Sequence, residues 1–112
     1  MTLSEKQRKF TLLISKLIQW AYANGMELTL GEAYRTLEQQ EIYFKQGKSK
    51  TLASKHLERL AVDFNLFIGG QYKTDKESYK PLAEYWKSLD PECVWGGDFN
   101  NFADCVHFQY GK

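Results

Sequence analysis

A chain of 112 residues has room for one domain with a single core of modest size. Its 15 basic and 14 acidic residues are mixed along the sequence and leave a formal net charge of +1, which argues against a broad electrostatic surface for nucleic acid or an anionic membrane. The N-terminus lacks the pattern of a signal peptide, and no apolar run approaches the roughly 20 residues that span a bilayer. We therefore expect one domain over residues 1–112 that is monomeric, made in the cytoplasm, not inserted in a membrane and without a nucleic-acid partner.

The N-terminal quarter predicts a helix followed by a strand. Ser4 is a candidate N-cap, with Gln7 three residues later, and apolar residues then recur at helical spacing until Asn24-Gly25 ends the pattern. Alternation of apolar and polar residues over Met26–Leu30 predicts a short strand.

The middle of the chain predicts a second helix, a loop and the clearest strand of the sequence. Thr36 with Gln39 has the form of a capping box, so the helix begins there and ends near Gly47. Residues 46–53, rich in lysine and serine, predict a mobile surface loop. Over Ala61–Ile68 apolar and polar side chains alternate, as in a strand with one buried face.

The C-terminal part predicts a hairpin, a third helix and two more strands. Gly69-Gly70 favours a two-residue turn before a return strand at 71–73. A shared apolar face predicts a helix over Ser78–Leu89, in which Pro81 is tolerable only in the first turn. Strands follow at 93–95 and 106–110. This order indicates an α+β domain with a mostly antiparallel sheet and helices packed on one face. Two isolated cysteines in such a chain favour free thiols.

Four residues from separate segments form a candidate metal site: His56, Asp63, Asp104 and His107. Two imidazoles and one carboxylate are ligands that hold catalytic zinc and leave a coordination position open. Asp63 and His107 lie on the polar faces of predicted strands, so they would share a groove if the strands were neighbours, and His56 would reach it from the preceding loop. Asp104 is then the candidate general base. Taken singly, each has a simpler interpretation: a structural histidine, a solvated carboxylate or a turn residue.

The sequence Ser-Lys-His-Leu-Glu-Arg-Leu-Ala-Val-Asp at 54–63 resembles the S-x-H-x-x-G-x-A-x-D signature of zinc D-Ala-D-Ala carboxypeptidases. Relatives of these enzymes include phage L-alanyl-D-glutamate endopeptidases, lysostaphin-like enzymes and the Hedgehog signalling domain. Residues 95–99 and 104–109 resemble the second half of the signature, and the chain is most similar to compact endolysin catalytic domains. The resemblance implies His56, Asp63 and His107 as zinc ligands and Asp104 as the catalytic acid and base.

The resemblance also implies residues that bind substrate. Ala33-Tyr34-Arg35-Thr36, with Gln39 or Gln40, is similar to the family's Y-R-[ST]…Q segment, and we take Gln39 as the glutamine. Arg35 would hold a substrate carboxylate or support the developing oxyanion, a task that suits a planar guanidinium. Without the resemblance, Arg35 is better interpreted as a surface charge at a helix start. Ser54 would contact substrate or orient its loop.

Three residues depart from the family pattern. Arg59 stands where glycine is frequent, which predicts a differently shaped loop between His56 and Asp63. Asp104 stands where many carboxypeptidases have glutamate, so its shorter side chain requires closer placement. Gln109 replaces a frequent glutamate that lies beside the metal ligands without being one.

The expected function is a zinc-dependent peptidase that cuts the peptide stem of bacterial peptidoglycan, between L-Ala and D-Glu, as a phage endolysin does after release. A D-Ala-D-Ala carboxypeptidase is one alternative. A non-catalytic, zinc-stabilised binding domain is another, which Asp104 disfavours. Cys105 is left out of the ligand set, no separate wall-binding domain is expected, and the basic segment Lys45–Lys55 is interpreted as a solvated lid.

Overall fold

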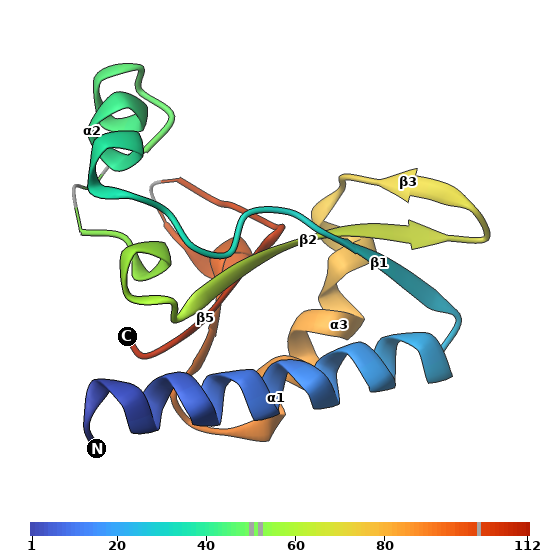
Figure 1. Ribbon diagram of the computed structural model, residues 1–112. Helices are drawn as coiled ribbons and strands as arrows, with labels where there is room; N and C mark the ends of the chain where they lie inside the picture. The colour runs from blue at the N-terminus through green and yellow to red at the C-terminus, as the bar shows by residue number, and fades with distance from the viewer. Residues whose placement is uncertain (50, 52, 101) are drawn as a thin grey trace.

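The computed structural model describes residues 1–112 except 50, 52 and 101, and two of these three lie in the predicted 46–53 loop (Figure 1). The elements in chain order are α1 (Leu3–Ala23), β1 (Met26–Leu30), α2 (Leu37–Lys45), the 3-10 turn η1 (Lys55–Glu58), β2 (Ala61–Ile68), β3 (Gln71–Lys73), α3 (Lys76–Leu89), β4 (Cys93–Trp95), the 3-10 turn η2 (Gly96–Asp98) and β5 (His107–Tyr110). None of the helices in the described part of the chain is both long and apolar enough to cross a membrane.

The strands form one antiparallel sheet in the order β1-β2-β5-β4, and β3 forms a hairpin with the end of β2. The long strand β2 is shared between two sets of neighbours. Its first three residues pair with β5, with Asp63 opposite His107, and its later residues pair with β1 and β3. The register therefore sets the first predicted carboxylate directly opposite the second histidine.

Helices α1 and α3 cover one face of the sheet, and α2 lies on the other side of it from α1 (Figure 1). The buried aromatic rings of Phe10, Trp86 and Phe108 join helices and sheet through edge-to-face contacts. A buried Tyr79 hydroxyl donates to the Phe64 carbonyl oxygen at 2.8 Å, so the polar end of this ring is satisfied inside the core. The predicted α+β class, with a mostly antiparallel sheet, is confirmed, but the expectation that all helices pack on one face holds for α1 and α3 and not for α2.

Most predicted elements lie where the sequence placed them, but two helices begin earlier than predicted. Thr2, not Ser4, caps α1, because its hydroxyl accepts from the Glu5 N–H while the Glu5 carboxylate accepts from the Thr2 N–H. Helix α3 begins at Lys76, since Asp75 accepts from the Ser78 N–H. Pro81 is therefore the sixth helical residue, and the expectation that it lies in the first turn was wrong.

Candidate metal centre

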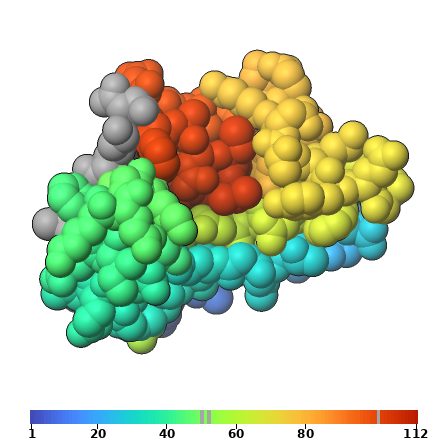
Figure 2. All heavy atoms as spheres, turned by 90° about the horizontal axis from the view of Figure 1, so that it is seen from above, coloured from blue at the N-terminus to red at the C-terminus, as the bar shows by residue number. Residues whose placement is uncertain are grey.

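A cavity of about 840 Å³ opens on the side of the sheet away from α1. Seen from above, the α2 region (green) and the C-terminal segment (orange to red) lie side by side on this face (Figure 2). Residues from both segments and from β2 line the cavity. Six of the seven residues singled out in the sequence lie in its wall: Arg35, Ser54, His56, Asp63, Asp104 and His107. Gln39 is the exception.

Asp63 and His107 face each other because their strands pair in register. The backbone on the other side of Asp63 is also fixed, since its N–H donates to the Glu32 carbonyl oxygen at 2.8 Å and its own carbonyl accepts from the Gly31 N–H at 2.7 Å. His107 was expected on a polar, outward face. That face is the cavity wall, and the His107 side chain is almost fully buried there.

His56 comes from the turn η1 rather than from a strand. The Ser54 hydroxyl caps this turn by accepting from the His56 N–H at 3.2 Å. The imidazole is 1% exposed, and its Nδ1 lies 2.9 Å from the carbonyl oxygen of Ala33. A carbonyl oxygen only accepts, so Nδ1 carries the proton and the lone pair of Nε2 points into the cavity.

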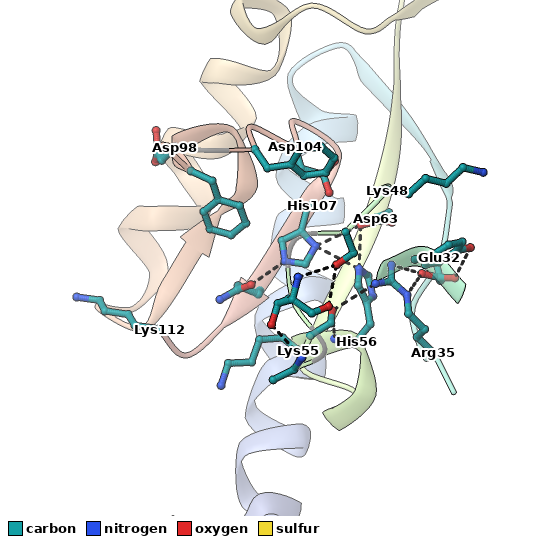
Figure 3. Close-up of a pocket in the computed structure, with 18 of the residues that line it drawn as sticks. Glu32, Arg35, Lys48, Lys55, His56, Asp63, Asp98, Asp104, His107 and Lys112 are labelled. Carbon is teal, nitrogen blue, oxygen red and sulfur yellow. Dashed lines mark hydrogen bonds and ion pairs between the residues drawn. The ribbon is translucent and has the colours of Figure 1, made fainter. Parts of the chain in front are cut away.

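The donor atoms of the three predicted ligands converge (Figure 3). His56 Nε2 lies 3.2 Å from Asp63 Oδ1 and 3.1 Å from His107 Nδ1, and each of the three residues offers an atom within 4.8 Å of the others. Asp63 Oδ1 is buried and has no hydrogen-bond partner among the described residues. Buried polar atoms are rarely left unpaired, so lone pairs and a carboxylate that face one another fit a cation between them.

The charges around the cavity shift the pKa values of its two carboxyl groups in opposite directions. Burial would raise the pKa of Asp63, but the ion pairs that its carboxylate forms with His107 and His56 when they are protonated outweigh burial and lower the pKa to about 2. For Asp104, burial and then the negative charge of Asp63 raise the pKa. Two nearby carboxyl groups with diverging pKa values suit different tasks: one as a permanent anion, the other as a proton carrier.

Asp104 lies beside His107 because a tight turn joins them. The Asp104 N–H donates to the Gly96 carbonyl oxygen at 2.9 Å, and the His107 N–H donates to the Asp104 carbonyl oxygen at 3.1 Å. Gly96 leaves no room for a side chain here: a Cβ atom would overlap the Asp104 carbonyl oxygen and lie 2.8 Å from His107 Cβ. Figure 3 shows Asp104 and His107 on one side of the cavity, with His56, Arg35 and Glu32 on the other.

Arg35 belongs to a network in the cavity wall and is not a solvated surface charge. It forms an ion pair with Glu32, and its Nη1 donates to Gln40 Oε1 at 2.7 Å. The buried Gln40 amide in turn donates to Ser49 Oγ at 2.9 Å. Arg35 Nη1 also lies 3.5 Å from Ser54 Oγ. The network therefore connects α2, the following loop and the start of η1.

The glutamine of this network is Gln40, which corrects the choice of Gln39. Gln39 does not line the cavity, and its backbone N–H donates to the hydroxyl of the helix cap Thr36. The two neighbours point about 100° apart around the helix, so only one can face Arg35. Glu32 was not predicted, although its spacing three residues before Arg35 is typical of a local ion pair.

The loop between His56 and Asp63 accommodates the unusual Arg59. The φ of Arg59, 57°, lies in the left-handed region, which glycine adopts most easily. The guanidinium carbon lies 4.0 Å from the centroid of the Tyr34 ring, a favourable cation–π contact. Arg59 thus adopts the backbone conformation that glycine favours, and His56 stays buried in the cavity.

A family model described as D-alanyl-D-alanine carboxypeptidase matches residues 47–110, which is more than half of the chain and includes the three converging side chains. The chain belongs to this family. The stretch that matches begins after Arg35 and Gln40, so those residues lie outside it.

Two sequence relatives of this chain are named as L-alanyl-D-glutamate peptidases or endopeptidases. The L-alanyl-D-glutamate peptidase of Listeria phage A118 is 39% identical over 100 residues, which cover 85% of this chain and 34% of the relative. The peptidoglycan L-alanyl-D-glutamate endopeptidase CwlK of Bacillus subtilis (strain 168) is 29% identical, over 76% of this chain and 61% of the relative. The chain therefore spans about a third and about three-fifths of the length of these two proteins.

Solved structures share the fold of this carboxypeptidase-family chain. The L-Ala D-Glu endopeptidase ChiX of Serratia marcescens superposes with a TM-score of 0.77 and 23% identity, covering 96% of this chain and 84% of that one. A mutant of the vancomycin resistance D,D-pentapeptidase VanY, in complex with Zn(II), gives a TM-score of 0.61 at 22% identity, covering 93% and 71%. These likenesses confirm the predicted fold.

Proposed function

We propose that the chain is a zinc-dependent peptidase that cleaves the peptide stem of bacterial peptidoglycan between L-alanine and D-glutamate. The observation that carries the proposal is the convergence of His56 Nε2 and His107 Nδ1 on Asp63 Oδ1, a buried oxygen without a hydrogen-bond partner among the described residues. The carboxyl group of Asp104 lines the same cavity. The names of the two sequence relatives support the choice of this bond. The place of action would be the cell wall, reached after release from the cell.

In this proposal His56, Asp63 and His107 hold the zinc ion. A zinc ion bound by three such ligands polarises a carbonyl oxygen and makes a nucleophile available from water at neutral pH. The permanent negative charge of Asp63 suits a ligand, because the low pKa of this carboxyl group keeps it ionised.

Asp104 would carry the proton. Its carboxylate accepts a proton from the attacking water and then donates it to the nitrogen of the departing amine. The raised pKa of Asp104 supports this role, because a carboxyl group that holds its proton more firmly is a better general base and is protonated when the amine leaves.

Arg35 and Ser54 would have unequal roles. The guanidinium of Arg35 lines the cavity and has more N–H groups than its contacts with Glu32 and Gln40 use, which supports binding of a substrate carboxylate or of the oxyanion. The Ser54 hydroxyl already accepts from the His56 N–H, which favours the loop-orienting role over contact with substrate.

The test is digestion of purified bacterial cell walls by the chain, with and without a chelator, followed by mass analysis of the products. We expect chelator-sensitive release of fragments with a new D-glutamate N-terminus. Release of free D-alanine would instead support the carboxypeptidase alternative, which the description of the matching family model favours. Zinc binding without any digestion would support the non-catalytic binding domain.

A substitution of Asp104 tests its role as general base separately from the binding of zinc by the three ligands. Asp104→Asn should leave one zinc bound per chain and lower the rate of digestion by about 10²- to 10⁴-fold, the usual contribution of general acid–base catalysis. Asp98→Asn is the matched control, since Asp98 lines the same cavity but pairs with Lys87 at 2.9 Å. Full activity of Asp104→Asn would remove Asp104 from the mechanism.

A further inference from the structure

Gln109 contacts a proposed metal ligand without being one. It lies two residues after His107 on β5, so both side chains point to the cavity side of the sheet. His107 is 6% exposed and Gln109 is 9% exposed, so water has little access to either side chain. Gln109 Oε1 lies 2.7 Å from His107 Nε2, the ring nitrogen that faces away from Asp63.

The hydrogen bonds of Gln109 settle which of its amide atoms faces the histidine. On one side, the amide lies 2.7 Å from the carbonyl oxygen of Gly111. A carbonyl oxygen only accepts, so the amide nitrogen must be on that side and the amide oxygen must face His107. The opposite orientation would bring two oxygens together. The Gly111 carbonyl is itself held in place, because the Gly111 N–H donates to the Glu92 carbonyl oxygen at 2.8 Å.

The orientation of the amide determines the tautomer of the neutral imidazole. An amide oxygen accepts, so the proton of His107 must be on Nε2, and the lone pair must be on Nδ1. Nδ1 is the nitrogen that lies 3.1 Å from His56 Nε2 and 3.5 Å from Asp63 Oδ1. In the absence of Gln109, the Asp63 carboxylate would draw the proton to Nδ1 and occupy the lone pair that a metal ion needs.

We infer that Gln109 is a positioning residue: anchored by the Gly111 carbonyl, it holds His107 in the tautomer whose Nδ1 can bind a metal ion. The inference rests on the metal site of the proposed function. Only a side chain with an acceptor and a donor at its end satisfies both neighbours. Glutamate would keep the acceptor toward His107, but it would set an oxygen against the Gly111 carbonyl.

The affinity for zinc, measured by competition with a chelator of known affinity, tests this inference. Gln109→Met keeps the length of the side chain but loses the acceptor, and we expect zinc to bind about 10- to 100-fold more weakly, as for other partners of metal-binding histidines. Gln109→Glu restores an acceptor and should recover most of that loss. Gln40→Met is the matched control: it also removes a buried amide, but that amide contacts Arg35 and Ser49 and not His107.

A second measurement identifies the tautomer of His107 directly. In zinc-free protein at alkaline pH, where the imidazole is neutral, the ¹⁵N chemical shifts of His107 show which ring nitrogen carries the proton. We expect Nε2–H in the native chain and a larger share of Nδ1–H in Gln109→Met.

Three results would overturn the inference: Nδ1–H in the native chain, native zinc affinity in Gln109→Met, or equal loss in Gln109→Glu and Gln109→Met. A native chain that binds zinc in the expected tautomer but digests no cell wall would overturn the proposed function alone.

Discussion

The two histidines reach the cavity by different routes. His107 is part of β5, a strand bonded on both sides to β2 and β4, and its partner across the sheet is Asp63. His56 is part of η1, a four-residue turn that ends at the left-handed Arg59. Hydrogen bonds of the sheet therefore fix the first histidine, whereas a capping hydroxyl, the Ala33 carbonyl and one unusual backbone conformation fix the second.

This difference predicts that the surroundings of the two histidines tolerate substitutions to different degrees. The segment from η2 through β5, which carries His107 and which we call the strand route, is rigid and crowded. At Gly96 the turn from η2 to β5 has no space for another atom. The η1 route contains exposed residues and side chains that can adjust. We therefore expect substitutions along the strand route to have larger effects than substitutions in the turn.

The largest effect is expected for Gly96→Ala. The new Cβ would overlap the carbonyl oxygen of Asp104 and crowd His107 Cβ, and because both neighbours belong to backbone-fixed segments, the turn must shift. We expect zinc affinity and wall digestion to fall by 10²-fold or more, since displacements near 1 Å at a catalytic site have effects of roughly that size. Chelator competition and the digestion assay measure the two losses.

A matched glycine separates displacement of the site from general instability. Gly70→Ala in the β2–β3 turn adds a methyl group at a φ of 77° with nothing within 4 Å, so it costs about 1 kcal/mol of backbone strain without touching the cavity. Its zinc affinity should equal that of the native chain. Equal zinc affinities in Gly96→Ala and the native chain would show that the strand route is less rigid than its contacts indicate.

The two routes also differ in how well the sequence predicted them. Alternation over Ala61–Ile68 is a direct consequence of one buried face, so it correctly set Asp63 on the cavity side, and the strand at the C-terminus did the same for His107. The convergence of these two with His56 and Asp104 was anticipated from residue chemistry together with the family resemblance. Repeating patterns therefore encode the placement of Asp63 and His107, but not that of His56 and Asp104.

The remaining parts depend on contacts that no repeating pattern encodes. Gln40 and Gln39 have the same chemistry, and only the direction of the helix relative to Arg35 decides between them. Glu32 and Gln109 act through contacts with side chains three and two residues away, and spacing alone does not show whether such neighbours meet. The early start of α3 has a similar cause, since an isolated Asp75 was not recognised as a cap.

An effect of intermediate size on the free energy of unfolding is expected for Asp63→Asn, because the Asp63 carboxylate lies beside both histidines. In zinc-free protein the pKa of Asp63 is about 2, below the ordinary value of 3.8, because the histidines stabilise the carboxylate. The carboxylate therefore stabilises the folded state above pH 4, and this contribution is lost as the pH falls toward 2. A shift of this size corresponds to about 2 kcal/mol.

Denaturant unfolding of zinc-free protein between pH 5 and pH 2 measures this contribution. The free energy of unfolding of the native chain should fall by about 2 kcal/mol more than that of Asp63→Asn over this range, because the amide does not titrate. Parallel curves for the two proteins would mean that the histidines and Asp63 do not interact in the zinc-free state.

The smallest effect is expected for Arg59→Gly, in the turn that carries His56. Glycine relieves about 1 kcal/mol of strain from the left-handed conformation, but it loses a cation–π contact of about 0.5–1 kcal/mol with Tyr34 and gains freedom in the unfolded chain. These terms nearly cancel, so stability should change by less than about 1 kcal/mol and zinc affinity should not change. Arg59→Val should lose more stability, since a β-branched residue tolerates this φ poorly. If Arg59→Gly instead weakened zinc binding tenfold, the guanidinium on Tyr34, and not the backbone of the turn, would be what positions His56.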